Sequence, residues 1–237
     1  MTSMHPKAGA RASLGKGRDR CVRRDEAGEP LMKAILAISA MALAGAAGVA
    51  HAEQRALSGF TQVAASAGTD VEVSVGGAFS VEVTGRDADR VVTRVSGNRL
   101  IIEPVRGNWF QRGPRDALVR VSMPRVEGLS ASSGADIVAT GVNGGAIALD
   151  SSSGADLRVS GRCDSFTADA SSGADIHASE LRCVNGSVDV SSGADVRINA
   201  SGRLDVEASS GGGVVSYGDA GLGTISLSSG GSHRRAS

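Results

Sequence analysis

Ser132-Ser133-Gly134-Ala135-Asp136 is one copy of a five-residue motif that recurs along the second half of this 237-residue chain. Three further copies match it in full, and two later ones keep only the Ser-Ser-Gly part. These five copies begin at Ser152, Ser171, Ser191, Ser209 and Ser228. Consecutive first serines are 20, 19, 20, 18 and 19 residues apart. A period near 20 is typical of solenoids, in which each unit buries its apolar face only against its neighbours.

Apolar or small side chains flank the copies with a period of two. The pairs three and one residues before the first serine are Leu129/Ala131, Leu149/Ser151, Ala168/Ala170, Val188/Val190, Val206/Ala208 and Ile225/Leu227. The pairs five and seven residues after it are Ile137/Ala139, Leu157/Val159, Ile176/Ala178, Val196/Ile198 and Val214/Ser216. Polar residues separate the members of each pair, so each pair marks a strand with one buried face. We therefore expect each coil to contain a strand, a Ser-Ser-Gly corner, a second strand and a loop.

The glycine of each corner provides either a positive φ angle or room for close backbone approach. The period-2 alternation and the 33 glycines exclude a helical solenoid. Stacked coils would place equivalent residues about 4.8 Å apart, the spacing of neighbouring strands. The predicted fold is all-β: a single-stranded right-handed parallel β-helix or β-solenoid with coils of about 20 residues and a β-rich N-terminal cap.

Residues 32–52 have the features of a secretory signal peptide. Met32-Lys33 precedes the apolar run from Ala34 to Ala50, and Ala50-His51-Ala52 forms an A-x-A cleavage signal. The run is too short and alanine-rich to favour a membrane span, and no cysteine at the cleavage point indicates a lipoprotein anchor. Residues 1–31 are polar and are expected to be disordered. They form either an extended n-region or sequence upstream of a true start at Met32.

The mature chain would comprise residues 53–237, enough for one substantial domain or two small ones. Five strands are predicted in its β-rich part, 53–126, which forms either the first, broader coils of the solenoid or a cap that closes its end. Residues 127–231 contain the repeat coils, and 232–237 are expected to be a polar tail. The five strands span 70–75, 79–83, 91–95, 100–105 and 117–123.

The charge distribution argues against nucleic acid as a partner. Residues 53–237 contain 17 Arg and 21 Asp plus Glu, and the repeat region from 127 onward contains 7 Arg against 13 acidic residues. Proteins that bind nucleic acid need basic patches to neutralise backbone phosphates. An acidic repeat region lacks that property.

Cys163 and Cys183 each lie eight residues before the next Ser-Ser-Gly, so they occupy equivalent positions in adjacent coils. Stacking brings such α-carbons within the roughly 4.4–6.8 Å range that a disulfide needs. Export favours oxidation of the pair, and a pair of reduced core thiols is the alternative. The spacing offers no further Cys or His for a zinc site.

The β-rich lead-in, the strand end at Met123-Pro124 and the serial Ser-Ser-Gly-Ala-Asp coils resemble the head GIN domain of putative autotransporter adhesins. The resemblance covers roughly residues 58–231. It implies an exported bacterial β-solenoid of unknown biochemical role. Nothing in this sequence resembles a β-barrel translocator, so the adhesin description itself carries little weight for function.

The segment from Arg106 to Arg115 joins two predicted strands and contains the only tryptophan. One interpretation is a hairpin tip whose aromatic side chains fold onto the cap. The other is a ligand loop, in which Trp109, Phe110 and Arg112 present an exposed surface to a glycan or a protein partner.

Aspartate closes each full motif, at Asp136, Asp156, Asp175 and Asp195. The simplest interpretation is an Asx-type corner, whose carboxylate accepts turn amides. Two residues later, Arg158, His177 and Arg197 lie on the same outward face, where they can pair with these aspartates.

A second acidic row precedes each motif by two residues, at Asp150, Asp169, Asp189 and Glu207. No basic residue in the same strands is offset to match it. The row either tolerates its own repulsion, about 0.8 kcal/mol per pair in water, or binds cations such as calcium. Calcium-binding β-rolls have a nonapeptide period, so that analogy is weak and no metal or other cofactor is expected.

A catalytic site would show a break in the repeat where unique residues converge on a cleft. The rows are regular in sequence, no Ser-His-Asp or Cys-His set is apparent, and His177 is the sole candidate acid–base group in the regular coils. We therefore expect an exported, non-enzymatic β-solenoid of the periplasm or cell surface that acts as a binding, adhesion-like or structural module. Its partner would be a glycan or an envelope protein, without membrane insertion. The alternative is a carbohydrate-active β-helix enzyme acting on an acidic polysaccharide.

Overall fold

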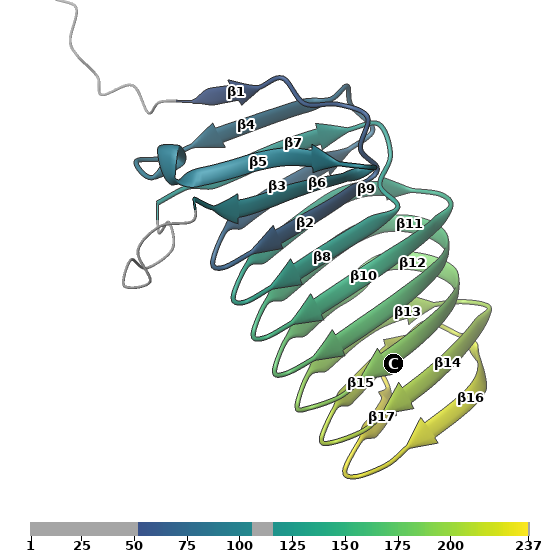
Figure 1. Ribbon diagram of the computed structural model, residues 1–237. Helices are drawn as coiled ribbons and strands as arrows, with labels where there is room; N and C mark the ends of the chain where they lie inside the picture. Colours follow the sequence, from purple (N-terminus) through teal and green to yellow (C-terminus); the bar gives the residue numbers. More distant parts are fainter. Residues whose placement is uncertain (1–51, 106–115, 237) are drawn as a thin grey trace, which may run out of the picture. The chain divides into compact units, whose positions relative to one another are not determined.

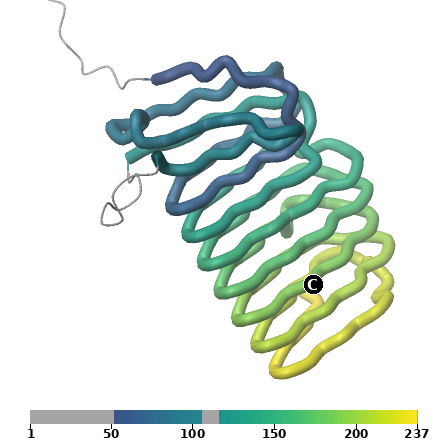
Figure 2. The backbone as a smooth tube through the Cα atoms, in the orientation of Figure 1, coloured from purple at the N-terminus to yellow at the C-terminus, as the bar shows by residue number. Residues whose placement is uncertain are grey.

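A computed structural model describes residues 52–105 and 116–236, which lie in one compact unit, Ala46–Ser237. The described residues form stacked parallel coils with two walls of strands, as predicted (Figure 1). The first wall contains the strands that run into the corners, and the second wall contains the strands that leave them. The tube in Figure 2 shows the chain winding from one wall to the other through successive coils.

Parallel pairing connects the neighbouring strands of each wall. In stacking order, the first wall consists of β6 (Arg99–Pro104), β2 (Gln62–Ser66), β8 (Gly128–Ser132), β10 (Ala146–Ser152), the second parts of β11 (Asp156–Ser171) and β12 (Asp175–Val190), β14 (Arg203–Ala208) and β16 (Gly221–Leu227). The second wall consists of β7 (Leu118–Met123), β3 (Asp70–Val75), β9 (Asp136–Asn143), the first parts of β11 and β12, β13 (Asp195–Ala200), β15 (Gly213–Tyr217) and β17 (Ser232–Arg235).

The core is a thin aliphatic layer between the two walls. The inward positions predicted from the alternation are buried from Leu129 to Ser216, with β-branched residues, leucines and alanines stacked on their equivalents in the next coil. The prediction was wrong at the last pair, because Ile225 is 36% exposed and Leu227 is 47% exposed. β16 pairs with β14 on one side, and no described strand pairs with its other side.

Each corner is a tight turn with two consecutive left-handed residues. Ser133 has a φ of 54° and Gly134 a φ of 73°, and the later corners repeat these values closely. The amide of Ala135 donates to the carbonyl of Ser132, which closes the turn, and positive φ at both central residues is the type I′ pattern. A Cβ built on Gly134 would meet nothing within 4 Å. The glycine is therefore needed for its φ angle and not for close backbone approach.

The predicted loop at the far side of the coil is a continuous bent strand in the middle of the stack. β11 and β12 each span 16 residues and pass from the second wall to the first without interruption. The register between them shifts between Arg158 and Gly161. The backbones of neighbouring coils thus stay hydrogen-bonded through this bend, which a loop would not achieve.

The N-terminal part contains both a regular coil and a cover. β2 and β3 form a coil around Ser66-Ala67-Gly68-Thr69-Asp70, whose residues pair in register with the motif that begins at Ser132. Ala67 has a φ of 58°, like the second serine of the later corners. This copy was not predicted from the sequence, because four further strands separate it from the next motif.

Those four strands lie on the side of this first coil that is opposite to β8 and β9. β6 and β7 continue the two walls. β4 (Ser80–Thr84) and β5 (Val91–Ser96) pair antiparallel with them and are linked by a short 3₁₀ helix (Ala88–Arg90), while β1 (Glu53–Arg55) pairs antiparallel with β4. The five strands predicted here are present as β3 to β7.

Two further expectations concern the chain ends and membranes. Residues 232–235, expected to be part of a polar tail, form β17 and pair with β15. The expected signal peptide lies outside the described residues, apart from Ala52. Within the described residues, no helix has the length and hydropathy required to cross a bilayer.

Candidate binding groove

The corner aspartates form an outward row at the start of the second wall. Asp70, Asp136, Asp156, Asp175 and Asp195 pair in register across successive strands. The carboxylate of Asp136 accepts a hydrogen bond from the backbone amide of Asp156 in the next coil, while two amides of its own corner bond to carbonyls of that coil. The amide of Ser133 donates to Ser152 O and that of Gly134 to Ser153 O, in the next coil. Partial burial and the charges of Asp156 and Asp70 raise the pKa of Asp136.

The next outward row of the second wall is basic over three coils. Arg158, His177 and Arg197 pair in register, as the sequence analysis predicted. Arg158 lies 3.8 Å from the carboxylate of Asp156. Arg197 Nη1 lies 2.9 Å from His177 Nδ1. Because a guanidinium can only donate, Nδ1 is the acceptor, and the neutral ring carries its proton on Nε2.

The regular rows break where β11 and β12 bend. Between aligned positions of these strands, β12 has one residue more than β11, and the register shifts near Gly161 in β11 and between Ala178 and Arg182 in β12. Gly161 has a φ of 137°, and a Cβ there would collide with the backbone of Val142. Only glycine fits this close approach. Beyond the break, Arg162 and Arg182 pair in register and point outward beside each other.

Two adjoining depressions follow this break across the coils. One has a volume of about 260 Å³ and the other about 450 Å³, and they share Ser179 and Glu180. We call them together the arginine groove. The first is lined by Val138, Ala139, Thr140, Arg158, Val159, Ser160, His177, Ser179 and Glu180, and the second by Gly161, Arg162, Ser179, Glu180, Arg182 and Asn199. The groove therefore combines basic groups, hydroxyls, one amide and an apolar end at Val138.

Sequence reasoning identified the outward row of Arg158, His177 and Arg197 but missed the rest of the groove. Arg162, Arg182 and Glu180 were missed because the second bend was expected to be a loop. Two signals were available. An arginine precedes each of the equivalent cysteines, and the coil length changes from 19 to 20 to 18 residues around this point.

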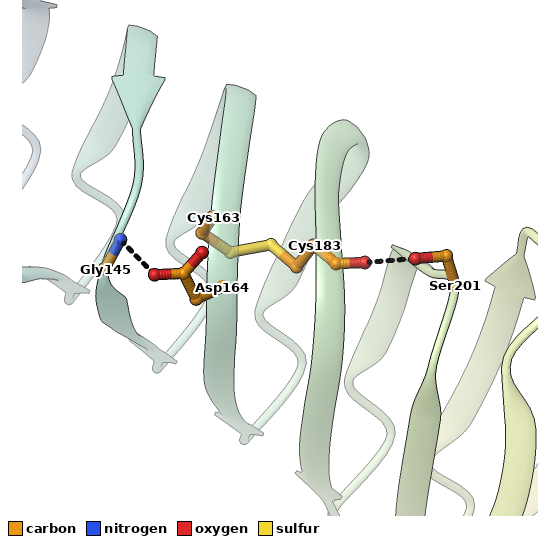
Figure 3. Close-up of a disulfide and its surroundings, with 5 residues drawn as sticks. All are labelled: Gly145, Cys163, Asp164, Cys183 and Ser201. Atoms are coloured by element: carbon orange, nitrogen blue, oxygen red, sulfur yellow. Dashed lines mark hydrogen bonds between the residues drawn. A yellow bond between two sulfur atoms is a disulfide. The ribbon is translucent and has the colours of Figure 1, made fainter.

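The disulfide lies next to the groove. Cys163 and Cys183 are joined, with their α-carbons 4.5 Å apart, and both are buried. Figure 3 shows the bond spanning neighbouring strands, with Gly145 N donating to Asp164 Oδ2 on one side and Ser201 Oγ donating to Cys183 O on the other. Since each cysteine directly follows Arg162 or Arg182, the bond holds these two arginines at adjacent positions.

The second acidic row runs along the outside of the first wall. Asp150, Asp169, Asp189 and Glu207 pair in register, as expected. Burial raises the pKa of Asp150 and, together with the charges of Asp150 and Asp189, that of Asp169. The described residues contain no group of three or more His, Cys, Asp or Glu side chains arranged to hold a metal ion. The row gives no structural support to the calcium hypothesis.

The predicted ligand loop lies outside the described residues. Trp109, Phe110 and Arg112 fall within 106–115, between β6 and β7.

The family described as "Putative auto-transporter adhesin, head GIN domain" matches residues 59–220. The chain belongs to this family. The match spans the regular coil around Ser66 and continues to the end of β15, which confirms the resemblance seen in the sequence. Among curated proteins, none matches the chain.

Two solved structures are similar to this head GIN domain in fold. One is a putative adhesin from Bacteroides fragilis, with 13% identity, a TM-score of 0.65 and coverage of 78% of this chain and 96% of that one. The other is a putative lipid binding protein from Parabacteroides distasonis, with 15% identity, a TM-score of 0.50 and coverage of 81% and 98%. At these identities the similarity shows the fold alone.

Proposed function

We propose that this protein is an exported, non-enzymatic, adhesion-like module that binds a cell-envelope ligand along the arginine groove. The observation that supports this function is the groove itself. It is the place where the regular outward rows break and where basic, hydroxyl and amide side chains from β9, β11, β12 and β13 converge. Membership in a family of putative adhesins is consistent with such a role.

The chemistry of the groove favours binding over turnover. His177 provides the imidazole of the groove, and Nδ1 of its ring accepts a hydrogen bond from Arg197. A general base needs a free nitrogen within reach of a nucleophile, and the hydrogen bonds among the described residues join His177 to no serine or carboxylate. Recognition through guanidinium and hydroxyl groups needs no such pair.

The proposal is tested by retention on envelope fractions. The purified protein, immobilised, should retain a component of the bacterial cell envelope and release it unchanged at high salt. Replacing Arg158 and Arg182 with Gln should abolish most of that retention. Substitution of Arg94 and Arg125, which lie in exposed ion pairs outside the groove, should leave it intact.

Two outcomes would contradict parts of this function. New reducing ends or unsaturated products after incubation with acidic polysaccharides would favour the carbohydrate-active enzyme. Export is tested separately by the intact mass of the protein recovered from the envelope. That mass should correspond to a chain that begins at Glu53, and a chain that keeps residues before Met32 would argue against the proposed signal peptide.

A further inference from the structure

We infer that the ligand of the arginine groove is a linear, carboxylate-bearing polysaccharide that lies across the coils, along the solenoid axis. This inference rests on the proposed binding function and specifies its ligand class. The arginines without partners, the spacing of the rows, the hydroxyl groups between them and the surrounding acidic groups support it.

The first argument is the state of the arginine pair. Most arginines of the described residues have an ion pair or a side-chain hydrogen bond, as Arg94, Arg120 and Arg203 do. Among the described arginines, Arg162, Arg182 and Arg234 have neither. Of these three, Arg162 and Arg182 lie in register on adjacent strands. Two like charges held side by side, with the cystine behind them, gain from an anion that binds both. Guanidinium forks match carboxylates in particular, because both groups are planar and can form two parallel hydrogen bonds.

The second argument is the direction and period of the groove. Its lining residues belong to successive coils, from Val138 on β9 to Asn199 on β13, so a ligand that fills it crosses the strands. Arg162 and Arg182 lie at the strand spacing of about 4.8 Å on one side, and Arg158 lies on the other side beside the neutral imidazole of His177. An extended polymer with regularly repeated charges fits this arrangement better than a compact ligand.

The third argument comes from the groups between the charges. Ser160 and Ser179 separate the two basic rows, with Thr140 at one end and Asn199 at the other. These side chains both donate and accept hydrogen bonds, which suits sugar hydroxyls. Val138 is 39% exposed at the same end as Thr140 and offers an apolar surface to the C–H face of a sugar ring.

The acidic groups exclude more highly charged polymers. Glu180 lies inside the groove, and the corner row with Asp156 and Asp175 runs beside it. Polymers with several sulfates per unit would be repelled more strongly by these carboxylates. A uronic acid polymer, with one carboxylate per sugar, meets the arginines with less repulsion.

The test measures binding of the purified protein to polygalacturonate fragments by calorimetry at low salt. Binding is expected, and the fully methyl-esterified polymer, which has the same sugars without charge, should bind at least tenfold more weakly. The double variant Arg162→Gln/Arg182→Gln should weaken binding to polygalacturonate at least tenfold. The control Arg94→Gln/Arg125→Gln should stay within about twofold of the unaltered protein, since it removes the same charge elsewhere.

Each alternative result is decisive. Equal binding of the esterified polymer, equal losses in both double variants, or tighter binding of heparin or single-stranded DNA would overturn the inference. Unfolding midpoints of the variants verify that they remain folded. Envelope retention without binding to polygalacturonate or to alginate, a second uronate polymer, would overturn this ligand class and leave the proposed function standing. Binding to polygalacturonate without envelope retention would support this ligand class and contradict the proposed envelope function.

Discussion

At the scale of single residues, two positions of each coil determine how the chain turns and what it buries. The second serine of the corner adopts a left-handed conformation that non-glycine residues seldom take, and it costs roughly 1–2 kcal/mol. The corner tolerates this because its amides bond to carbonyls of the next coil, as Gly134 does with Ser153. The inward positions of the strands then supply the hydrophobic stabilisation that offsets such strain.

Ile176 and His177 test the inward and outward assignment. Ile176 is fully buried between Leu157 and Val196, whereas His177 faces outward and bonds to Arg197. Ile176→Asp should lower the free energy of unfolding by at least about 3 kcal/mol, because a charge would be buried without a partner. His177→Asp should change it by no more than about 0.5 kcal/mol, since the new carboxylate can still accept from Arg197. Urea unfolding midpoints measure both, and equal damage would refute the assignment.

The raised pKa of Asp169 should make the folded protein more stable at mildly acidic pH than at neutral pH. Burial and the neighbouring carboxylates raise its pKa in the folded state, so the ionised form is less stable there than in the unfolded chain. Its contribution to stability therefore increases as the pH falls through the folded pKa, and it stops changing below the unfolded value near 3.9. Asp169→Asn should raise the urea midpoint at pH 7, which corresponds to a gain of no more than about 0.5 kcal/mol in the free energy of unfolding. The difference between the variant and the unaltered protein should vanish near pH 4.

Asp205 is the matched control for this pH dependence, because its sign is opposite. The bond from Arg203 and the amide of Thr224 lower the pKa of Asp205 to about 2. Its stabilising effect is present above the unfolded pKa and is lost as the pH falls toward 2. Asp205→Asn should thus lower the urea midpoint at pH 7. Identical pH profiles for the two variants would show that neither shift affects folding.

At the scale of elements, β11 and β12 connect the fold with the groove. Each strand bends from one wall to the other, carries a groove arginine at the bend, and is joined to its neighbour by the disulfide directly after that arginine. The bulge that shifts the register also opens the groove beside Glu180. The register shift, the groove and the disulfide therefore lie next to one another on these two strands.

Removing the disulfide should affect stability and binding together. The closed loop spans about 20 residues, so replacing both cysteines with alanine should lower the free energy of unfolding by about 3 kcal/mol on loop-entropy grounds. Binding to the groove should weaken as well, because Arg162 and Arg182 would no longer be held together. Non-reducing peptide mapping and urea midpoints provide the measurement. Two alkylatable thiols in native, oxidised protein would argue against the stacking register.

At the scale of the whole solenoid unit, the two described ends differ. Antiparallel strands cover the N-terminal end. The last described coil instead places His233 and Arg235 at inward positions of β17, in register with Val214 and Ser216. His233 Nε2 bonds to Ser216 Oγ at 2.8 Å, and Arg235 donates to the carbonyl of Ala220. Inward-pointing polar groups are a known means of preventing edge-to-edge pairing of strands.

Replacing Arg235 should make the molecule associate through this end. Leu222, Ile225 and Leu227 of β16 are already partly exposed there, and Arg235→Leu would extend the apolar surface to β17. We expect Arg235→Leu to form concentration-dependent dimers or larger species in analytical ultracentrifugation. The sedimentation of the unaltered protein should change little with concentration. Arg234→Leu is the matched control, because Arg234 faces outward and lies beside the same strand edge. Equal association of both variants would indicate a general loss of solubility instead.

The features predicted correctly from the sequence are those that depend on neighbours along the chain or on a repeated offset. The glycine at each corner, the alternation in the repeat strands up to β15 and the equivalent positions of Cys163 and Cys183 all follow from the period near 20. Such features are local, and a stack of similar coils repeats them at the same positions. The row of Arg158, His177 and Arg197 was predicted for the same reason.

Only the tertiary structure determines the features that depend on pairing between distant segments or on a departure from the period. The coil around Ser66 lies between β6–β7 and β8–β9, an order that no local pattern encodes because four strands intervene in sequence. The side-by-side position of Arg162 and Arg182 depends on a bulge at a bend that was expected to be a loop. The sequence by itself determined the repeating coil, because its chemistry is local. The groove and the N-terminal cover arise where the repeat is broken, and there long-range packing determines which residues meet.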